Sequence, residues 1–304
     1  MALTLVEAAK LSNDTLKVGV IETIASESSE LLRLPFIPVL GNSLTYNREN
    51  ASATATFYDV GDTWTEDTPT FTQFTAPLKI IGGDSDVDNF LKRTRSNIND
   101  LEAEVLTMKA KAVANLFSNT FINGNTTTNP KSFEGVDRLI VGGQIGSMGI
   151  NGATLSLAKM DELIDLVKGG LPTALEMSRR TRRQLLALLR ATGSGVLETT
   201  RDAFGRPVEH YAGIPIAIND WISDTQTQGT STDATTIYAL NMNPVDGLCG
   251  IASESVAGDA SSLIDVETVG QLETKDATRH RVKMYASLVL FRTTSAAKLV
   301  GIRP

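Results

Sequence analysis

The sequence predicts a mixed helix-and-sheet (α+β) protein with long parts that extend beyond its core. Three segments carry this prediction. Residues 44–79 alternate apolar and polar side chains and are rich in threonine, as a β-ribbon is. Residues 86–121 repeat apolar side chains every three or four positions, as a long amphipathic helix does. Residues 263–304 read as two or three long strands.

Composition limits the class of protein. The chain has 304 residues, 41% hydrophobic and 21% charged, enough for one large domain or two modest ones with a true core. The net charge of −7 argues against a dedicated nucleic-acid binder but leaves open loose contact through a local basic patch. The single cysteine, Cys249, is expected to be buried like a small apolar residue. The sequence predicts neither a signal peptide nor a membrane-spanning helix.

The stretch GDTWTEDTPTFTQF, residues 61–74, is the most unusual part of the alternating segment. It places a tryptophan beside an acidic pair and resumes the alternation after Pro69, which predicts a ribbon with an acidic, aromatic turn. Residues 82–84 are expected to end the ribbon. Because such a ribbon buries little surface in its own subunit, we expect a neighbouring subunit to cover it. The candidate contact residues are Trp64, Glu66, Asp67, Phe71 and Phe74.

A long helix is expected after the ribbon, capped at its N-terminus by Asp84 or Asp86. At 1.5 Å per residue, about 30 residues of helix span about 45 Å, which is unusual in a small domain. The predicted buried stripe of this helix is Val87, Phe90 or Leu91, Ile98, Leu101, Val105, Met108, Ala112 and Leu116.

Shorter elements follow the long helix. Two amphipathic helices are predicted, one capped by Ser156 and ended by a glycine pair, the other capped by Ser178. Residues 212–222 and 235–243 read as short buried strands. Residues 223–236, rich in serine and threonine, read as a flexible loop.

The sequence shows no reaction centre. His210 and His280 lie in separate segments without the spacing of a zinc site; we expect His210 in a strand or turn and His280 exposed on a charged strand. The glycine-rich residues 142–149 lack the immediately following helix that a phosphate loop needs, so we read them as a flexible loop. No catalytic residue, metal or cofactor is predicted.

A basic cluster begins the helix that Ser178 caps. A stripe of leucines indicates that the opposite face is buried. The arginines therefore face another subunit, solvent or, as a third option, nucleic acid. We predict an inter-subunit contact for Arg179, Arg180, Arg182 and Arg183.

The order of these parts resembles the major capsid proteins of tailed bacteriophages with the Johnson (Hong Kong 97 type) fold. WTEDTPTFTQFTAPLKIIGG is similar to that family's pattern of tryptophan, acidic pair, proline, phenylalanine and apolar residues before its spine helix. LPTALEMSRRTRRQLLALLRATGSGVL resembles its axial-domain segment, and GRPVEHYAGIPIAIND its stretch with two glycine–proline motifs. KDATRHRVKMYASLVLFRTTSAAKLVGI resembles its closing strands. The resemblance covers nearly the whole chain.

The resemblance implies five parts along the chain. They are an N-terminal arm at 1–43, an extended β-ribbon loop at 44–82, a spine helix with the first part of a peripheral domain at 83–154, an axial domain at 155–262, and return strands at 263–304. It implies a structural protein, not an enzyme, that forms hexamers and pentamers of an icosahedral shell around double-stranded DNA. The implied partners are copies of itself, a portal protein, separate scaffolding and decoration proteins, and loosely held DNA, with no membrane. The implied location is the virion, with assembly in the cytoplasm of a bacterial host.

Two departures from the family pattern shape the expectation. The spine begins near residue 86, which leaves no room for the long N-terminal scaffolding region of some members, so a separate scaffolding protein or none is expected. No lysine lies between Lys17 and Lys79, so the loop does not supply the amine that cross-links the shells of some members. We therefore expect non-covalent contacts or a separate cementing protein.

Two alternatives stay open. An encapsulin-like nanocompartment shell would share the fold and hold protein cargo, and a groove for a cargo peptide would favour it. An enzyme would need an activity that titrates with His210 or His280.

Overall fold

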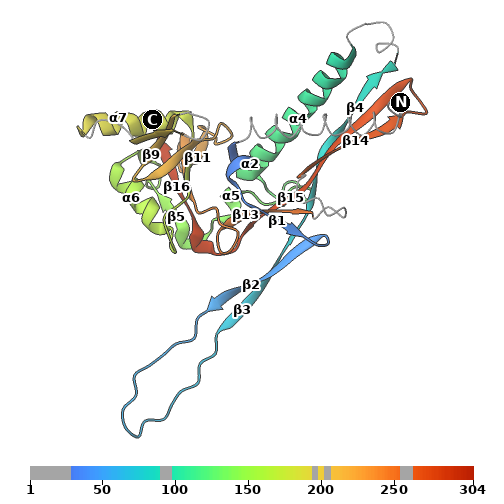
Figure 1. Ribbon diagram of the computed structural model, residues 1–304. Coiled ribbons are helices and arrows are strands. Elements are labelled where there is room, and N and C mark those ends of the chain that lie inside the picture. Colours follow the sequence, from blue (N-terminus) through green and yellow to red (C-terminus); the bar gives the residue numbers. More distant parts are fainter. Residues whose placement is uncertain (1–28, 90–97, 194–197, 202–206, 254–262) are drawn as a thin grey trace.

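The computed structural model describes residues 29–89, 98–193, 198–201, 207–253 and 263–304. Figure 1 shows a body of helices and strands, from which a long helix and long strands project in one direction and a two-stranded ribbon in another. The predicted α+β class and the projecting ribbon are therefore confirmed. Most of the expected N-terminal arm, residues 1–28, lies outside the described residues.

The larger sheet forms the centre of the body. Among the described residues its order is β5-β16-β12-β7-β10-β9-β8, with β11 beside β12 and β6 beside β16. Its strands are β5 (Ile145–Ser147), β6 (Ala153–Thr154), β7 (Ala174–Met177), β8 (Glu198–Arg201), β9 (Pro207–Tyr211), β10 (Ile214–Ile218), β11 (Gln226–Gln228), β12 (Ser231–Leu240) and β16 (Ala296–Arg303). β12 lies between β16 and β7 and is buried from Ala234 to Leu240, as the apolar run predicted.

Two helices pack on one face of this sheet. α6 (Leu157–Leu166) and α7 (Arg179–Ala191) begin after the predicted caps, Ser156 and Ser178, whose side chains accept hydrogen bonds from backbone amides of the first turn. The apolar stripes of the helices meet the sheet in one cluster. Its buried members include Met160, Leu163, Leu175, Met177, Leu185, Ile237 and Leu299.

The smaller sheet extends away from the body. Its order is β1-β13-β15-β14, with β4 also paired to β15. The strands are β1 (Phe36–Val39), β4 (Lys79–Asp88), β13 (Leu248–Ser253), β14 (Ile264–Gln271) and β15 (Ala277–Leu290). Among the residues that the structure describes, the ribbon strands β2 (Ser43–Ala51) and β3 (Thr70–Pro77) pair only with each other. The short helical elements are α2 (Ser29–Arg33), α5 (Val136–Leu139), η1 (Gly142–Gln144) and η2 (Thr293–Ser295).

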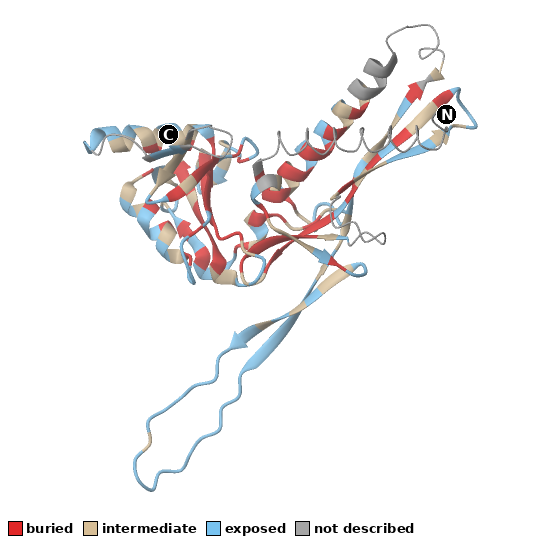
Figure 2. Cartoon of the chain, viewed as in Figure 1, coloured by how far each residue is buried: buried red, intermediate tan, exposed pale blue. Residues whose placement is uncertain are grey.

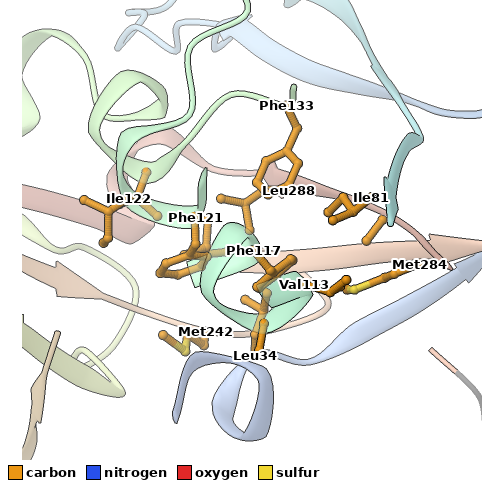
Figure 3. Packing of buried hydrophobic residues seen from close by; sticks show 14 of the residues in the cluster. Leu34, Ile81, Val113, Phe117, Phe121, Ile122, Phe133, Met242, Met284 and Leu288 are labelled. Atoms are coloured by element: carbon orange, nitrogen blue, oxygen red, sulfur yellow. The ribbon is translucent and has the colours of Figure 1, made fainter. Parts of the chain in front are cut away.

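The long helix α4 (Ile98–Asn123) packs over the smaller sheet and joins it to the body (Figure 3). Phe117 is at the centre of this contact, with its ring 6.3 Å from that of Phe36 and 5.8 Å from that of Phe133. Burying each such aromatic side chain stabilises the fold by about 1.5–3 kcal/mol. The buried residues of the helix are Leu106, Ala110, Val113, Ala114, Phe117, Phe121 and Ile122.

The predicted stripe of this helix was wrong at several positions. Val87 is buried as expected but lies in the strand β4, and Val105 is partly buried. Met108 is 60% exposed and Leu116 51% exposed, and Ala112 lies on the same open face. The helix carries a second apolar repeat, rotated from the predicted one, and that repeat contains the phenylalanines. The larger rings bury more apolar area, so they face the sheet.

The predicted start of the helix and end of the ribbon were also wrong. Asp84 and Asp86 do not cap a helix; they lie in β4, which runs through the glycine pair at residues 82 and 83. The cause is pairing with β15, a strand distant in sequence. Arg281 of that strand donates a hydrogen bond to Asp84 at 2.7 Å, and Arg279 donates one to Asp86 at 2.6 Å. Gly82 fits this pairing because a Cβ there would lie 2.4 Å from the carbonyl oxygen of Val282.

Three smaller expectations need correction. His280 is buried, because alternation along β15 turns it towards the same side as Val282 and Met284. Part of the expected flexible loop at 223–236 is a hairpin of β11 and β12. The expected glycine-rich loop contains η1 and β5, and β5 pairs with β16.

Candidate assembly surfaces

The ribbon is the most exposed part of the described chain (Figure 2). β2 and β3 pair antiparallel from Ser43 opposite Pro77 to Ala51 opposite Thr70. Beyond that point residues 52–69 continue outward without a backbone ladder, and nearly all of them are exposed. We call residues 52–69 the tip and the paired strands the root of the ribbon.

Side-chain contacts join the two sides of the tip. Trp64 stacks on Tyr58 with ring centroids 4.4 Å apart. The Tyr58 hydroxyl lies 2.7 Å from the hydroxyl of Thr65. The Asp67 carboxylate accepts hydrogen bonds from the hydroxyl (2.5 Å) and the amide (2.8 Å) of Thr54, and these bonds lower the pKa of Asp67. The tip is therefore partly ordered before any partner binds.

The tip carries apolar side chains that the described residues do not cover. Phe57 and Val60 are fully exposed, Trp64 is 78% exposed and Phe71, just inside the root, is 67% exposed. Exposed apolar groups gathered in one segment mark an interaction surface. The sequence prediction named Trp64 and Phe71 but missed Phe57 and Val60, whose positions in the same alternating run were the available signal.

The predicted ribbon residues differ in what they contact. Phe74 is 37% exposed and stacks on Tyr46 of its own chain, with ring centroids 5.8 Å apart. Asp67 is engaged with Thr54. Glu66 is exposed and makes no hydrogen bond or ion pair within the described part of the chain. Trp64, Glu66 and Phe71 are thus the members most open to a neighbour.

Two of the predicted arginines pair within the subunit. Arg179 donates two hydrogen bonds to Asp220, at 2.7 and 2.9 Å. Arg182 donates two to Glu209. The bonds raise the pKa of each arginine and lower the pKa of each carboxyl group. They join the first turn of α7 to β9 and to the residues that follow β10.

The other two arginines differ from each other. Arg180 donates to the carbonyl oxygen of Asp233 at 2.8 Å and lies 3.5 Å from the carboxylate of Asp224. Arg183 is exposed and forms no hydrogen bond or ion pair with any residue that the structure describes. Of the cluster, Arg183 is the member open to another molecule.

His210 and Cys249 both lie in strands of the structure. His210 lies in β9 as expected, with its Nδ1 3.0 Å from the carbonyl oxygen of Val208. Cys249 is buried as expected, and burial raises the pKa of its thiol to about 12. Among the residues described, no group of three histidine, cysteine or carboxylate side chains is placed to hold a metal. No described helix is both long and apolar enough to span a membrane.

These features define a class of protein. A projecting ribbon with an uncovered apolar tip is characteristic of a structural subunit that its neighbours complete.

Comparison with known proteins identifies the family. The sequence model of the Phage capsid family matches residues 13–247, and this chain belongs to that family. The family is structural and not enzymatic, so the chain is a major capsid protein that associates with copies of itself in a virion shell, as predicted. A search of curated protein sequences finds no match.

Solved structures share the fold at low sequence identity. The SrpI encapsulin of Synechococcus elongatus PCC 7942, in its holo complex, is 18% identical and has a TM-score of 0.68 over 100% of this chain and 97% of that chain. The capsid of a native GTA particle is 13% identical, with a TM-score of 0.63 over 92% and 90%. A structure from Microbacterium phage Oxtober96 is 16% identical, with a TM-score of 0.63 over 91% of both chains.

Proposed function

We propose that the ribbon is the joint of a tailed-phage head. In this proposal the ribbon lies across the neighbouring subunit of a ring, and hexameric and pentameric rings close into an icosahedral shell around double-stranded DNA. The uncovered tip carries the proposal, because Trp64 and Phe57 expose large rings to water. Covering one such ring contributes about 1.5–3 kcal/mol, and a closed shell repeats the contact at every subunit.

The regions of the fold fit the parts of such a subunit. We assign α4 as the spine, the smaller sheet with β4, β14 and β15 as the peripheral domain, and the larger sheet with α6 and α7 as the axial domain. The strand β4 then belongs to the peripheral domain, so we place the extended loop at residues 43–77.

Polar contacts give the joint its register in this proposal. Glu66 on the tip and Arg183 on α7 are exposed and unpaired within the described residues, so each is available to the opposite charge of another subunit. An exposed ion pair contributes only about 0–1 kcal/mol, so such contacts align subunits more than they hold them.

Further partners belong to the same proposal. A portal protein, separate scaffolding and decoration proteins, and assembly in the bacterial cytoplasm complete the head. The net charge of −7 supports loose, non-specific contact with DNA, which must move into and out of the shell. Residues 43–77 contain no lysine, so the loop has no side-chain amine for a covalent cross-link.

Electron microscopy of the full chain with a paired substitution tests the joint. We expect the wild type to form closed hollow shells or rings of five and six, and Phe57→Ala with Trp64→Ala to leave unassembled protein of unchanged helix content. Ile150→Ala is the matched control, because Ile150 is 86% exposed but lies on the body, outside the ribbon. The proposal would be contradicted if the double variant formed shells in normal yield, or if the wild type stayed monomeric even with a scaffolding protein.

An encapsulin-like compartment is the second candidate, because the SrpI structure covers 100% of this chain. The contents of particles purified from the native source separate the two. Nuclease-protected double-stranded DNA of uniform length supports the phage head. A stoichiometric enzyme without DNA supports the compartment.

A further inference from the structure

Arg48 ties the root of the ribbon to the end of β15. We infer that this residue sets the direction in which the ribbon leaves the body, and so acts as a positioning residue for assembly. The role of Arg48 in assembly rests on the proposed function. The effect of Arg48 on the direction of the ribbon does not, and it is tested separately.

Arg48 makes two hydrogen bonds to consecutive backbone carbonyl groups. Its Nε donates to Phe291 at 2.9 Å and its Nη2 donates to Leu290 at 2.6 Å. Both carbonyls belong to the chain where β15 ends. A guanidinium group is a planar fork with fixed donor directions, so bonds to two fixed acceptors hold it in one orientation.

Aromatic rings enclose the same guanidinium group. Its carbon lies 4.4 Å from the centre of the Phe74 ring, within the range of a cation–π contact. Tyr46 stacks on Phe74 and meets Phe291 edge to face, at 5.2 Å. The Tyr46 hydroxyl also donates to the Leu290 carbonyl at 3.4 Å. We call Arg48, Tyr46, Phe74 and Phe291 the ribbon clamp.

The ribbon clamp lies between the root of the ribbon and the end of β15, where it can control the direction of the ribbon relative to the body. β2 and β3 form a sheet of their own, so no backbone ladder runs from the ribbon to the body among the described residues. The ribbon joins the body through chain connections at residues 42 and 78, where the Leu78 amide donates to Asn42 at 2.8 Å. Connections at one end act as a hinge, and the clamp adds contacts farther along the ribbon.

The effect of the clamp grows with distance from the hinge. About 12 extended residues beyond Arg48 span about 40 Å at 3.3 Å per residue. A change of about 10° at the root then moves the tip by about 7 Å, as far as the largest distance between ring centroids in an aromatic contact. A small loss of orientation at Arg48 is therefore enough to misplace Trp64 on a neighbouring subunit.

Distances between two spin labels measure the direction of the ribbon. Asp62→Cys places one label on the tip and Asp165→Cys places the other on α6, and both sites are exposed. Cys249 stays in place because its buried thiol, with a pKa near 12, does not react with the label. One doubly labelled subunit is diluted into excess unlabelled subunits so that only distances within a chain are recorded.

We expect the distance distribution to widen at least twofold in Arg48→Ala and by less in Arg48→Lys, which keeps the charge but not the fork. Phe74→Leu removes the ring but keeps both hydrogen bonds from Arg48 to the backbone carbonyls, and should widen the distance distribution by an intermediate amount. This variant still tests the inference if Arg48→Ala does not fold. Arg190→Ala, an exposed arginine on α7 without a partner among the described residues, is the control. A distribution in Arg48→Ala as narrow as in the wild type overturns the inference.

Assembly is measured on the same variants. We expect folded Arg48→Ala to give open or irregular assemblies, while Arg190→Ala gives normal shells. Normal shells from Arg48→Ala would overturn the role in assembly. A wild type without shells would instead contradict the proposed function, and the label distances would still decide whether Arg48 orients the ribbon.

Discussion

Replacing Glu176 with glutamine is expected to remove a pH dependence from the stability of this protein. Glu176 lies in β7, fully buried, opposite Tyr238 of β12. Its carboxyl group accepts a hydrogen bond from the Asn219 amide at 3.2 Å. Burial, and then the nearby charge of Glu30, raise the pKa of Glu176 from 4.5 to about 8, against smaller opposing effects of Asn219 and Arg33.

The sign and the size follow from this raised pKa. Below pH 4.5 the group is protonated in both the folded and the unfolded chain, so it contributes no pH dependence. Between pH 4.5 and about 8 only the folded chain keeps the proton, and the free energy of unfolding falls as pH rises. At about 1.4 kcal/mol per pH unit, the loss reaches about 5 kcal/mol near pH 8 and then stays constant.

Urea unfolding of wild type and Glu176→Gln from pH 4.5 to 9 measures the effect. Circular dichroism at low protein concentration follows the unassembled chain. Glutamine resembles the protonated acid, so the two proteins should be about equally stable near pH 4.5, and the variant should gain up to about 5 kcal/mol over the wild type by pH 8. Glu162→Gln, at an exposed site on α6, should follow the wild type. Parallel curves for Glu176→Gln and wild type would refute the reasoning.

Three further predictions concern stability, each measured by urea unfolding at pH 7. Phe117→Ala should lower the free energy of unfolding by about 3–5 kcal/mol, because Phe117 is 1% exposed at the centre of the contact between α4 and the smaller sheet. Ser178→Ala should cost about 1–2 kcal/mol, because Ser178 caps α7 and donates to Asp224 at 2.6 Å, whereas Ser178→Thr should retain most of the stability. Gly82→Ala should cost about 1–3 kcal/mol from crowding against β15, and Gly143→Ala, with open space around it, should cost less than half as much.

Elements specified by neighbouring residues were predictable from the sequence. The helices α6 and α7 have a capping serine, an apolar stripe and glycines beyond the end, all within about four turns. The buried strand β12 was visible as an apolar run, and the ribbon as alternation with threonine. Each signal lies within the element that it specifies or within a few residues of its ends, so no distant contact was needed to detect it.

Elements specified by distant residues were not predictable in the same way. Residues 82–88 form a strand because β15 supplies Arg279 and Arg281 to Asp86 and Asp84, about 195 positions later in the chain. The helix α4 carries two apolar repeats, and only the sheet beneath it decides which one is buried. His280 is buried on the side of β15 that carries Val282 and Met284, although its neighbours in sequence are charged.

The exposed apolar tip was predicted in outline but not in detail. Alternation and an isolated tryptophan indicated the tip in the sequence. Only the structure shows that Trp64 and Phe71 are largely exposed, whereas Arg48 and Tyr46 partly cover Phe74. The arginine cluster showed its charge in the sequence but not its partners. These partners come from other strands and loops, and they leave Arg183 as the open member among the described residues.

The ribbon combines a fixed root with an ordered but uncovered tip, and this division suits a joint between subunits. At the root, a small core of Val39, Cys249, Ile251 and Val289 and the ribbon clamp hold the strands to the body. At the tip, the internal contacts of residues 52–69 already restrict side chains that binding would otherwise have to order. Ordering a free side chain costs about 0.5–1.5 kcal/mol, so this restriction preserves affinity while the apolar surface stays available. A ribbon loose at the root would lose that advantage, because every copy would have to find its neighbour from many directions.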